Sequence, residues 1–135
     1  MKRILQISLI LFTAIAIPGQ AETGQAPDSA AVGRGLALYE TNCVQCHQAA
    51  GAGENIPLDI RHPDFIPAMP LNEKAHAWHH GDAQLVQMIQ RGNTRMPAFS
   101  NILTEAELHD LVAYMKSLWS PRIIACQGPK HMACM

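Results

Sequence analysis

Apolar residues recur at the spacing of an α-helix in three stretches of the chain, and no stretch shows the strict alternation of a half-buried strand. The first stretch is residues 30–46. Five residues in it fall on one helical face: Val32, Leu36, Tyr39, Cys43 and Cys46. The spacing predicts one helix over residues 30–46.

A second helix is predicted over residues 82–91. Asp82 is a good N-cap and Gly92 stands just past the last helical position. Three apolar residues form a stripe that suits burial: Leu85, Val86 and Ile89.

The third helix has the best-defined start. Thr104 and Glu107 form a capping box, and Leu103 and Leu108 occupy the hydrophobic staple positions. Helical spacing then continues until Pro121 ends the helix. Because all three predicted elements are helices, we expect an all-α fold.

Residues 48–81, between the first two helices, show little periodicity and carry four prolines. A structureless segment of this length normally argues against a compact domain. The objection disappears if the segment wraps a buried cofactor and packs apolar side chains on it. We therefore expect one domain, residues 31–120, in which the helices and this loop enclose a cofactor.

The first 21 residues have the composition of a cleavable secretory signal. Lys2 and Arg3 precede an apolar run, and the small residues Gly19 and Ala21 suit a signal peptidase. A retained anchor is the alternative, but the run is shorter than the roughly 20 apolar residues that a span needs. We expect export to the periplasm and no membrane span after signal removal.

Residues 22–30 are polar and rich in small side chains, which predicts a flexible leader. Without the signal the chain keeps 8 basic and 11 acidic residues, a net charge of −3. No basic stripe or charge run indicates a nucleic-acid partner.

The strongest chemical signal is the motif Cys-x-x-Cys-His at residues 43–47, which is typical of c-type haem attachment. Two thiols three residues apart on a helical turn lie about 60° apart around the axis, so both can add to vinyl groups on one porphyrin edge. His47 follows at once and can reach the iron. The motif predicts one covalent haem c, bound through Cys43 and Cys46.

Two other kinds of site use similar motifs. A thioredoxin-like redox pair would need a βαβ pattern around it, and the chain has none. A four-thiolate zinc site would need Cys126 and Cys134, which lie far away at an unsuitable spacing.

Met96 is the candidate for the second axial ligand. It lies 49 positions beyond His47 and precedes a proline. A thioether suits reduced iron and raises its potential. The donors that could bind iron instead are Met69, His79 and His80.

Together these residues resemble the class I, or mitochondrial-type, cytochromes c of bacteria, over residues 32–119. In that family the helix carrying Cys-x-x-Cys-His crosses the last helix closely, and a loop methionine supplies the sixth iron ligand. The resemblance implies a cytochrome c fold in which Cys43 and Cys46 anchor the haem. It implies His47 and Met96 as the axial ligands.

The resemblance also implies that Gly35 and Tyr114 meet at the helix crossing. Gln48 departs from the family, which often has a glycine directly after the haem histidine. We expect the carbonyl of Pro57 to accept a hydrogen bond from His47 and so to orient its ring. Arg91 and Arg95 are expected to be solvated or to pair with a haem propionate.

The function implied is one-electron transfer between redox partner proteins by a monomeric carrier that is not an enzyme. Two alternatives stay open. One is a haem enzyme or sensor with a labile sixth ligand. The other is a copper-handling protein, because closely spaced imidazoles can chelate metal. The loop histidines in question are His76, His79 and His80, for which solvent exposure and propionate contact are further readings.

Residues 121–135 form a tail outside the resemblance. In an exported chain its two cysteines, Cys126 and Cys134, most simply form a disulfide, and Gly128-Pro129 supplies a turn between them. If the cysteines are reduced, a soft-donor set for Cu(I) results. It would add three residues to the two thiols: His131, Met132 and Met135.

Overall fold

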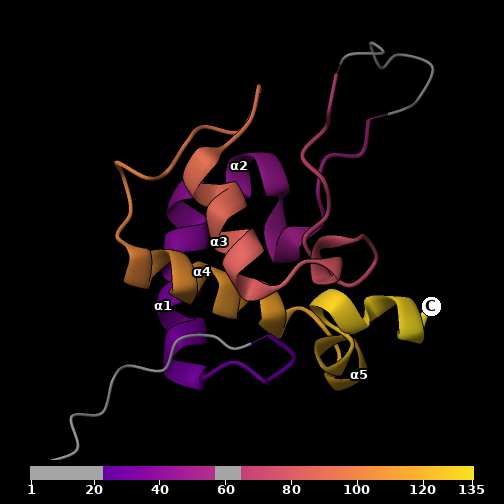
Figure 1. Ribbon diagram of the computed structural model, residues 1–135. Helices are drawn as coiled ribbons and strands as arrows, with labels where there is room; N and C mark the ends of the chain where they lie inside the picture. Colours follow the sequence, from indigo (N-terminus) through magenta and orange to yellow (C-terminus); the bar gives the residue numbers. More distant parts are fainter. Residues whose placement is uncertain (1–22, 57–64) are drawn as a thin grey trace, which may run out of the picture.

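The computed structural model describes residues 23–56 and 65–135, so the expected signal peptide lies outside the described residues. The described elements are helices without a strand among them, which confirms the all-α class (Figure 1). The α-helices are α1 (Ser29–Asn42), α2 (Val44–His47), α3 (Asp82–Arg91), α4 (Glu105–Ser117) and α5 (Pro121–Ala125). Short 3-10 helices are η1 (Ala49–Gly51), η2 (Ala77–His79) and η3 (Gly128–Cys134). Neither described range contains a helix that is both long and apolar enough to cross a membrane.

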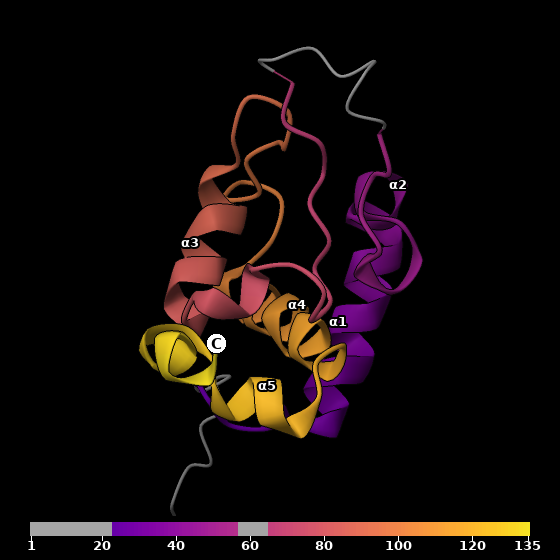
Figure 2. The same ribbon diagram turned by 90° about the vertical axis from the view of Figure 1, so that its right-hand side faces the viewer.

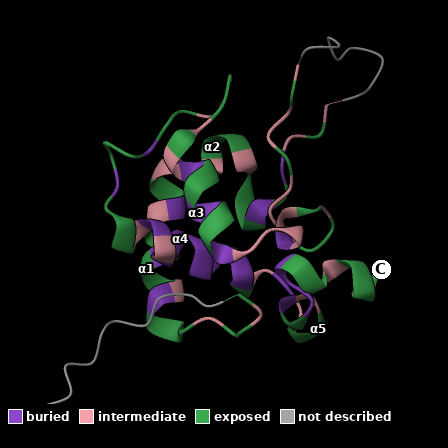
Figure 3. Ribbon diagram, in the orientation of Figure 1, coloured by how far each residue is buried: buried purple, intermediate pink, exposed green. Residues whose placement is uncertain are grey.

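The helix α4 is the centre of the domain. Every residue from 110 to 116 is buried, so α4 has neighbours on all sides of this stretch (Figure 3). The helices α1 and α3 both pack on it (Figure 2). Its start agrees with the prediction: the amide of Glu107 donates to Thr104 Oγ1, and the amide of Thr104 donates to the Glu107 carboxylate at 2.7 Å.

The contact of α1 with α4 is close because Gly35 has no side chain. A Cβ at Gly35 would collide with the carbonyl oxygen of Asp110 and would lie 2.9 Å from the Cβ of Tyr114. One turn further along α1, the ring of Tyr39 packs against that of Tyr114 with 4.8 Å between centroids. The implied meeting of Gly35 and Tyr114 is therefore confirmed.

The first helix differs from its prediction because it is broken. Rather than running through residues 30–46, α1 ends at Asn42 and α2 begins at Val44, with Cys43 between them at φ −122°. The side chains of Thr41 and Asn42 donate hydrogen bonds to carbonyls four residues back, at 2.9 Å each. Such bonds compete with regular helix geometry. The break changes the direction in which Cys46 and His47 project relative to the axis of α1.

The start of α3 also differs from the prediction. Gly81 is the N-cap, and Asp82 is the first helical residue, with its side chain turned inward. Lys116 of α4, which is 0% exposed, donates to Asp82 Oδ2 at 2.9 Å, and Gln127 donates to Oδ1 at 2.5 Å. A buried charge is tolerated only when it is paired and hydrogen-bonded. Asp82 therefore joins α3 to α4 and to the tail instead of capping a helix.

The tail packs on the domain and is closed by a disulfide between Cys126 and Cys134, as predicted. Gln127 is 1% exposed. In addition to its bond with Asp82, its side-chain Nε2 donates to the carbonyl of His80, and its Oε1 accepts from the backbone amide of Gly24. The ring of His131 stacks on that of His79 with 4.5 Å between centroids. The tail thus holds the segment around η2 in place.

Gly33 and Gly35 give a matched test of the helix crossing. A Cβ at Gly33 meets nothing within 4 Å, so Gly33→Ala should stabilise the holoprotein by up to about 1 kcal/mol through helix propensity. Gly35→Ala should destabilise it by about 1–3 kcal/mol because the contact with α4 becomes overpacked. Denaturant unfolding measures both. Equal effects of the two substitutions would show that α1 and α4 do not meet at Gly35.

The disulfide should contribute to stability by restricting the unfolded chain. Replacing both Cys126 and Cys134 with Ser should lower the free energy of unfolding by about 2–3 kcal/mol, the chain-entropy value for so short a loop. Mass spectrometry of the unreduced protein should find the Cys126–Cys134 link. Two free thiols in that measurement would contradict the bond.

Candidate haem site

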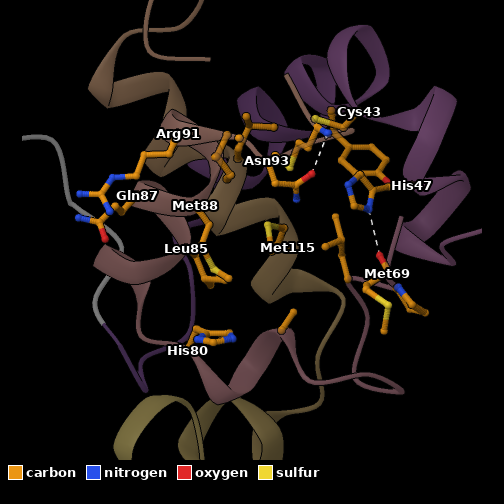
Figure 4. Close-up of a pocket in the computed structure, with 18 of the residues that line it drawn as sticks. Cys43, His47, Met69, His80, Leu85, Gln87, Met88, Arg91, Asn93 and Met115 are labelled. Atoms are coloured by element: carbon orange, nitrogen blue, oxygen red, sulfur yellow. Dashed lines mark hydrogen bonds between the residues drawn. The ribbon is translucent and has the colours of Figure 1, made fainter. Parts of the chain in front are cut away.

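A cavity of about 370 Å³ opens between the Cys-x-x-Cys-His segment, α3, α4 and the loop before η2 (Figure 4). Its apolar walls include Leu71, Leu85, Ile89, Leu111 and Met115. A second hollow of about 170 Å³ adjoins it. Cys43, His47 and Met96 line both spaces, which together form one cleft.

The four residues predicted to hold the haem lie on this cleft. Cys43, His47 and Met96 line both parts, and Cys46 lines the smaller one. Cys43 and Cys46 are free thiols, so both are chemically available for thioether bonds. Burial, and then the neighbouring Cys46, raise the pKa of Cys43 to about 11. An apolar cleft with two thiols, an imidazole and a thioether on its wall fits a haem c.

His47 is oriented by a backbone carbonyl of the loop before η2. Its Nδ1 donates to the carbonyl oxygen of Met69 at 3.0 Å, and Pro57 lies outside the described residues. Since a carbonyl can only accept, Nδ1 carries the hydrogen and Nε2 is left with a lone pair. That tautomer is the one needed to bind iron through Nε2.

The turn after His47 is strained. Gln48 has φ +61° and ψ 170°, a region that is essentially restricted to glycine, and Ala50 has φ +52°. Tyr39 on α1 donates its hydroxyl to the Gln48 carbonyl at 2.5 Å. Burial raises the pKa of Tyr39 to about 12, so this hydroxyl keeps its proton. Tyr39 thereby ties the strained turn to α1.

Met96 is presented by a tight turn. The side-chain Oδ1 of Asn93 accepts hydrogen bonds from the backbone amides of Arg95 and Met96, at 3.0 Å each. The backbone amide of Asn93 donates to the Met96 carbonyl at 2.8 Å. Gly92 has φ +63°, and a Cβ there would collide with that carbonyl. Sequence reasoning singled out Met96 but missed Asn93, although an Asn three residues before the ligand is a recognisable turn signal.

Arg95 is exposed, as expected, and its guanidinium is also paired with a carboxylate of the protein. It forms a two-pronged ion pair with Glu54, at 2.7 and 2.9 Å. Arg95 first, and then the amide of Ala68, lower the pKa of Glu54 to about 2. The pairing was invisible to sequence reasoning because the two residues are 41 positions apart and no periodicity connects them.

The histidines divide into two groups. His76 and His80 line the cleft, whereas His79 stacks on His131. Burial, and then neighbouring imidazoles, lower the pKa values of His79 and His80. Within residues 23–56 and 65–135, no group of three or more His, Cys, Asp or Glu side chains is placed to hold a metal ion. The Cu(I) set of the tail is also not formed, because its two thiols are bonded to each other.

The sequence is similar to that of several known proteins. Residues 30–115 match the family described as "Cytochrome C oxidase, cbb3-type, subunit III". The cbb3-type cytochrome c oxidase subunit CcoP of Azospirillum brasilense is 33% identical over 92 residues, which are 67% of this chain and 30% of that protein. CcoP of Azospirillum sp. (strain B510) is 29% identical over 96 residues, 70% of this chain and 31% of the relative.

Subunit FixP of the same oxidase type, from Sinorhizobium medicae (strain WSM419), is 28% identical over 88 residues, 65% of this chain and 30% of its own length. The chain therefore spans about a third of the length of the curated relatives that it matches. No solved structure matches it. The end of α4 and the whole tail lie outside the family match, which stops at residue 115.

The strain at Gln48 can be tested by one substitution. Gln48→Gly should raise the free energy of unfolding of the holoprotein by about 1 kcal/mol, because glycine adopts this backbone conformation without strain. Gln45→Gly, an exposed position inside α2, is the control and should lower it by about 1 kcal/mol. A loss of stability in Gln48→Gly comparable to that control would contradict the strained turn.

Proposed function

The chain belongs to the family of cbb3-type cytochrome c oxidase subunit III, and from this membership we propose that it is a periplasmic one-electron transfer protein. A cytochrome c domain of this family carries covalently bound haem c with iron. We assign the thioether bonds to Cys43 and Cys46, the proximal ligand to His47 and the distal ligand to Met96. The bound haem supplies a one-electron couple, ferric to ferrous.

One observation carries the proposal. His47 and Met96 are 49 positions apart in the sequence, yet they line the same two parts of one cleft, next to Cys43. With haem bound, His47 and Met96 would both be available as iron ligands, so the site would be suited to passing electrons without admitting a substrate. The chemistry assigned to this chain is therefore electron transfer, not catalysis.

Met96 is preferred to Met69 and His79 on structural grounds, whereas His80 also lines the larger part of the cleft. The carbonyl of Met69 is bonded to Nδ1 of His47, so its backbone lies on the side of the ring remote from Nε2. His79 is engaged with His131 and is not part of the wall of the cleft. Met96 is instead fixed by the Asn93 turn, on a loop separate from the one whose carbonyl bonds Nδ1 of His47.

The residues of the cleft also define how the site works. Apolar side chains from α3 and α4 exclude water, which limits solvent reorganisation when the charge of the site changes. The hydrogen bond from Nδ1 fixes the imidazole ring of His47 and makes Nε2 a stronger donor. A fixed ligand set keeps its geometry in both oxidation states.

The redox partner is proposed from the relatives, which are named as subunits of a cbb3-type cytochrome c oxidase. We propose that this chain passes electrons to an oxidase of that kind, and that the reduction of the terminal acceptor occurs on other subunits. The charged and apolar run at the start of the sequence supports a periplasmic location. Affinity purification of the tagged holoprotein from solubilised membranes tests the partner, and recovery of no oxidase subunit would contradict it.

The ligand assignment predicts a spectroscopic signature. Oxidised holoprotein should be low-spin and should show the weak far-red iron–sulfur charge-transfer band. Met96→Ala should abolish this band, lower the reduction potential and let added cyanide bind, since the soft thioether is lost. The control is Met88→Ala, which removes another thioether from the wall of the cleft and should keep the band.

Two outcomes would contradict the assignment. If Met96→Ala keeps the band and Met69→Ala loses it, the distal ligand is Met69. If the wild-type protein is high-spin, the sixth position is open, and a haem enzyme or sensor becomes the better description.

A further inference from the structure

Arg95, the residue directly before the proposed ligand Met96, is held on several sides. Its Nη1 donates to Glu54 Oε2 at 2.7 Å and to the carbonyl of Ile66 at 2.9 Å, and its Nη2 donates to Glu54 Oε1 at 2.9 Å. Its guanidinium carbon lies 4.0 Å from the centroid of the Phe65 ring. A two-pronged pair with a stacked aromatic ring fixes both the position and the orientation of a guanidinium.

Glu54 is equally fixed on its side. Its carboxylate accepts from the amide of Ala68 at 2.8 Å, and its own amide donates to the Ala68 carbonyl at 2.8 Å. The residue after Ala68 is Met69, whose backbone carbonyl accepts the hydrogen bond that orients His47. A continuous series of bonds therefore runs from the ligand of one face to the ligand of the other. The series passes through five residues: Met96, Arg95, Glu54, Ala68 and Met69.

We propose that Glu54 and Arg95 are positioning residues that latch Met96 across the cleft and so control how readily the sixth iron position opens. The inference rests on the proposed function, in which Met96 is the distal ligand. The ion pair joins the loop that carries Met96 to the loop that supports His47. Breaking it would leave Met96 held by the turn formed by Asn93 and by the remaining contacts of Arg95 with Ile66 and Phe65.

The exposure of the pair supports a mechanical role. The side chains of Arg95 and Glu54 are 35% and 20% exposed, so neighbouring atoms cover part of each. Arg95 itself lines the smaller part of the cleft, beside Ile66, Ala68 and Met96. The pair therefore stands at the edge of the smaller part of the cleft.

The chain offers a matched control. Arg34 and Asp110 form another two-pronged pair, with both bonds at 2.7 Å, but it joins α1 to α4 and neither residue lines the cleft. Glu54→Gln and Asp110→Asn each neutralise one carboxylate without changing its size. Only the first should affect Met96.

The experiment measures the rate at which imidazole replaces the thioether in the ferric holoprotein, followed by loss of the far-red band. Glu54→Gln should show the band at rest but should bind imidazole at least tenfold faster than wild type. Asp110→Asn should bind at the wild-type rate within a factor of two, whatever its effect on thermal unfolding. A double variant, Glu54→Gln with Arg95→Gln, should be no faster than the quicker single variant, because the two residues act as one unit.

The failures are distinguishable. A wild-type protein that lacks the far-red band overturns the assignment of Met96 and, with it, the latch. If the band is present but Glu54→Gln binds imidazole at the wild-type rate, only the latch is overturned. Equal acceleration by Asp110→Asn, or fully additive effects in the double variant, would show general loosening of the fold and would also overturn it.

Discussion

The close crossing of α1 and α4 at Gly35 is the constraint on which the rest of the structure depends. It places the end of α1, and therefore Cys43 and the residues that follow, beside the inner face of α4. Leu111 and Met115 on that face then become walls of the cleft. Because Gly35 meets the backbone of Asp110 and not a movable side chain, the distance between the helices is set without adjustment.

The two proposed iron ligands, His47 and Met96, are held by different means. His47 follows directly from a helix end and is oriented by one carbonyl of the opposite loop. Met96 stands on a loop and needs a tight turn, a glycine and an ion pair to fix its place. Fixing a side chain on a loop costs more conformational entropy than fixing one on a helix. Additional bonds are therefore needed to hold the loop side chain in an equally well-defined position. Of the two proposed ligands, the one on the loop is accordingly expected to be the more labile.

Local signals in the sequence identified most of the fold but little of its tertiary bonding. The capping box at Thr104 and the Cys-x-x-Cys-His motif were readable, because each depends on residues a few positions apart. Asp82 looked like an N-cap for the same reason, since nothing local distinguishes a capping carboxylate from one that pairs with Lys116. Likewise, no pattern could connect Glu54 with Arg95, because their contact exists only once two loops have wrapped the cleft.

The buried position of Gln127 has a consequence for the order of assembly. Its side-chain amide forms hydrogen bonds with Gly24, with the carbonyl of His80 and with the buried carboxylate of Asp82 at the start of α3. A chain that emerges N-terminus first cannot acquire these bonds until residue 127 is available. The Cys-x-x-Cys-His segment ends 80 residues earlier and is therefore synthesised well before these bonds can form.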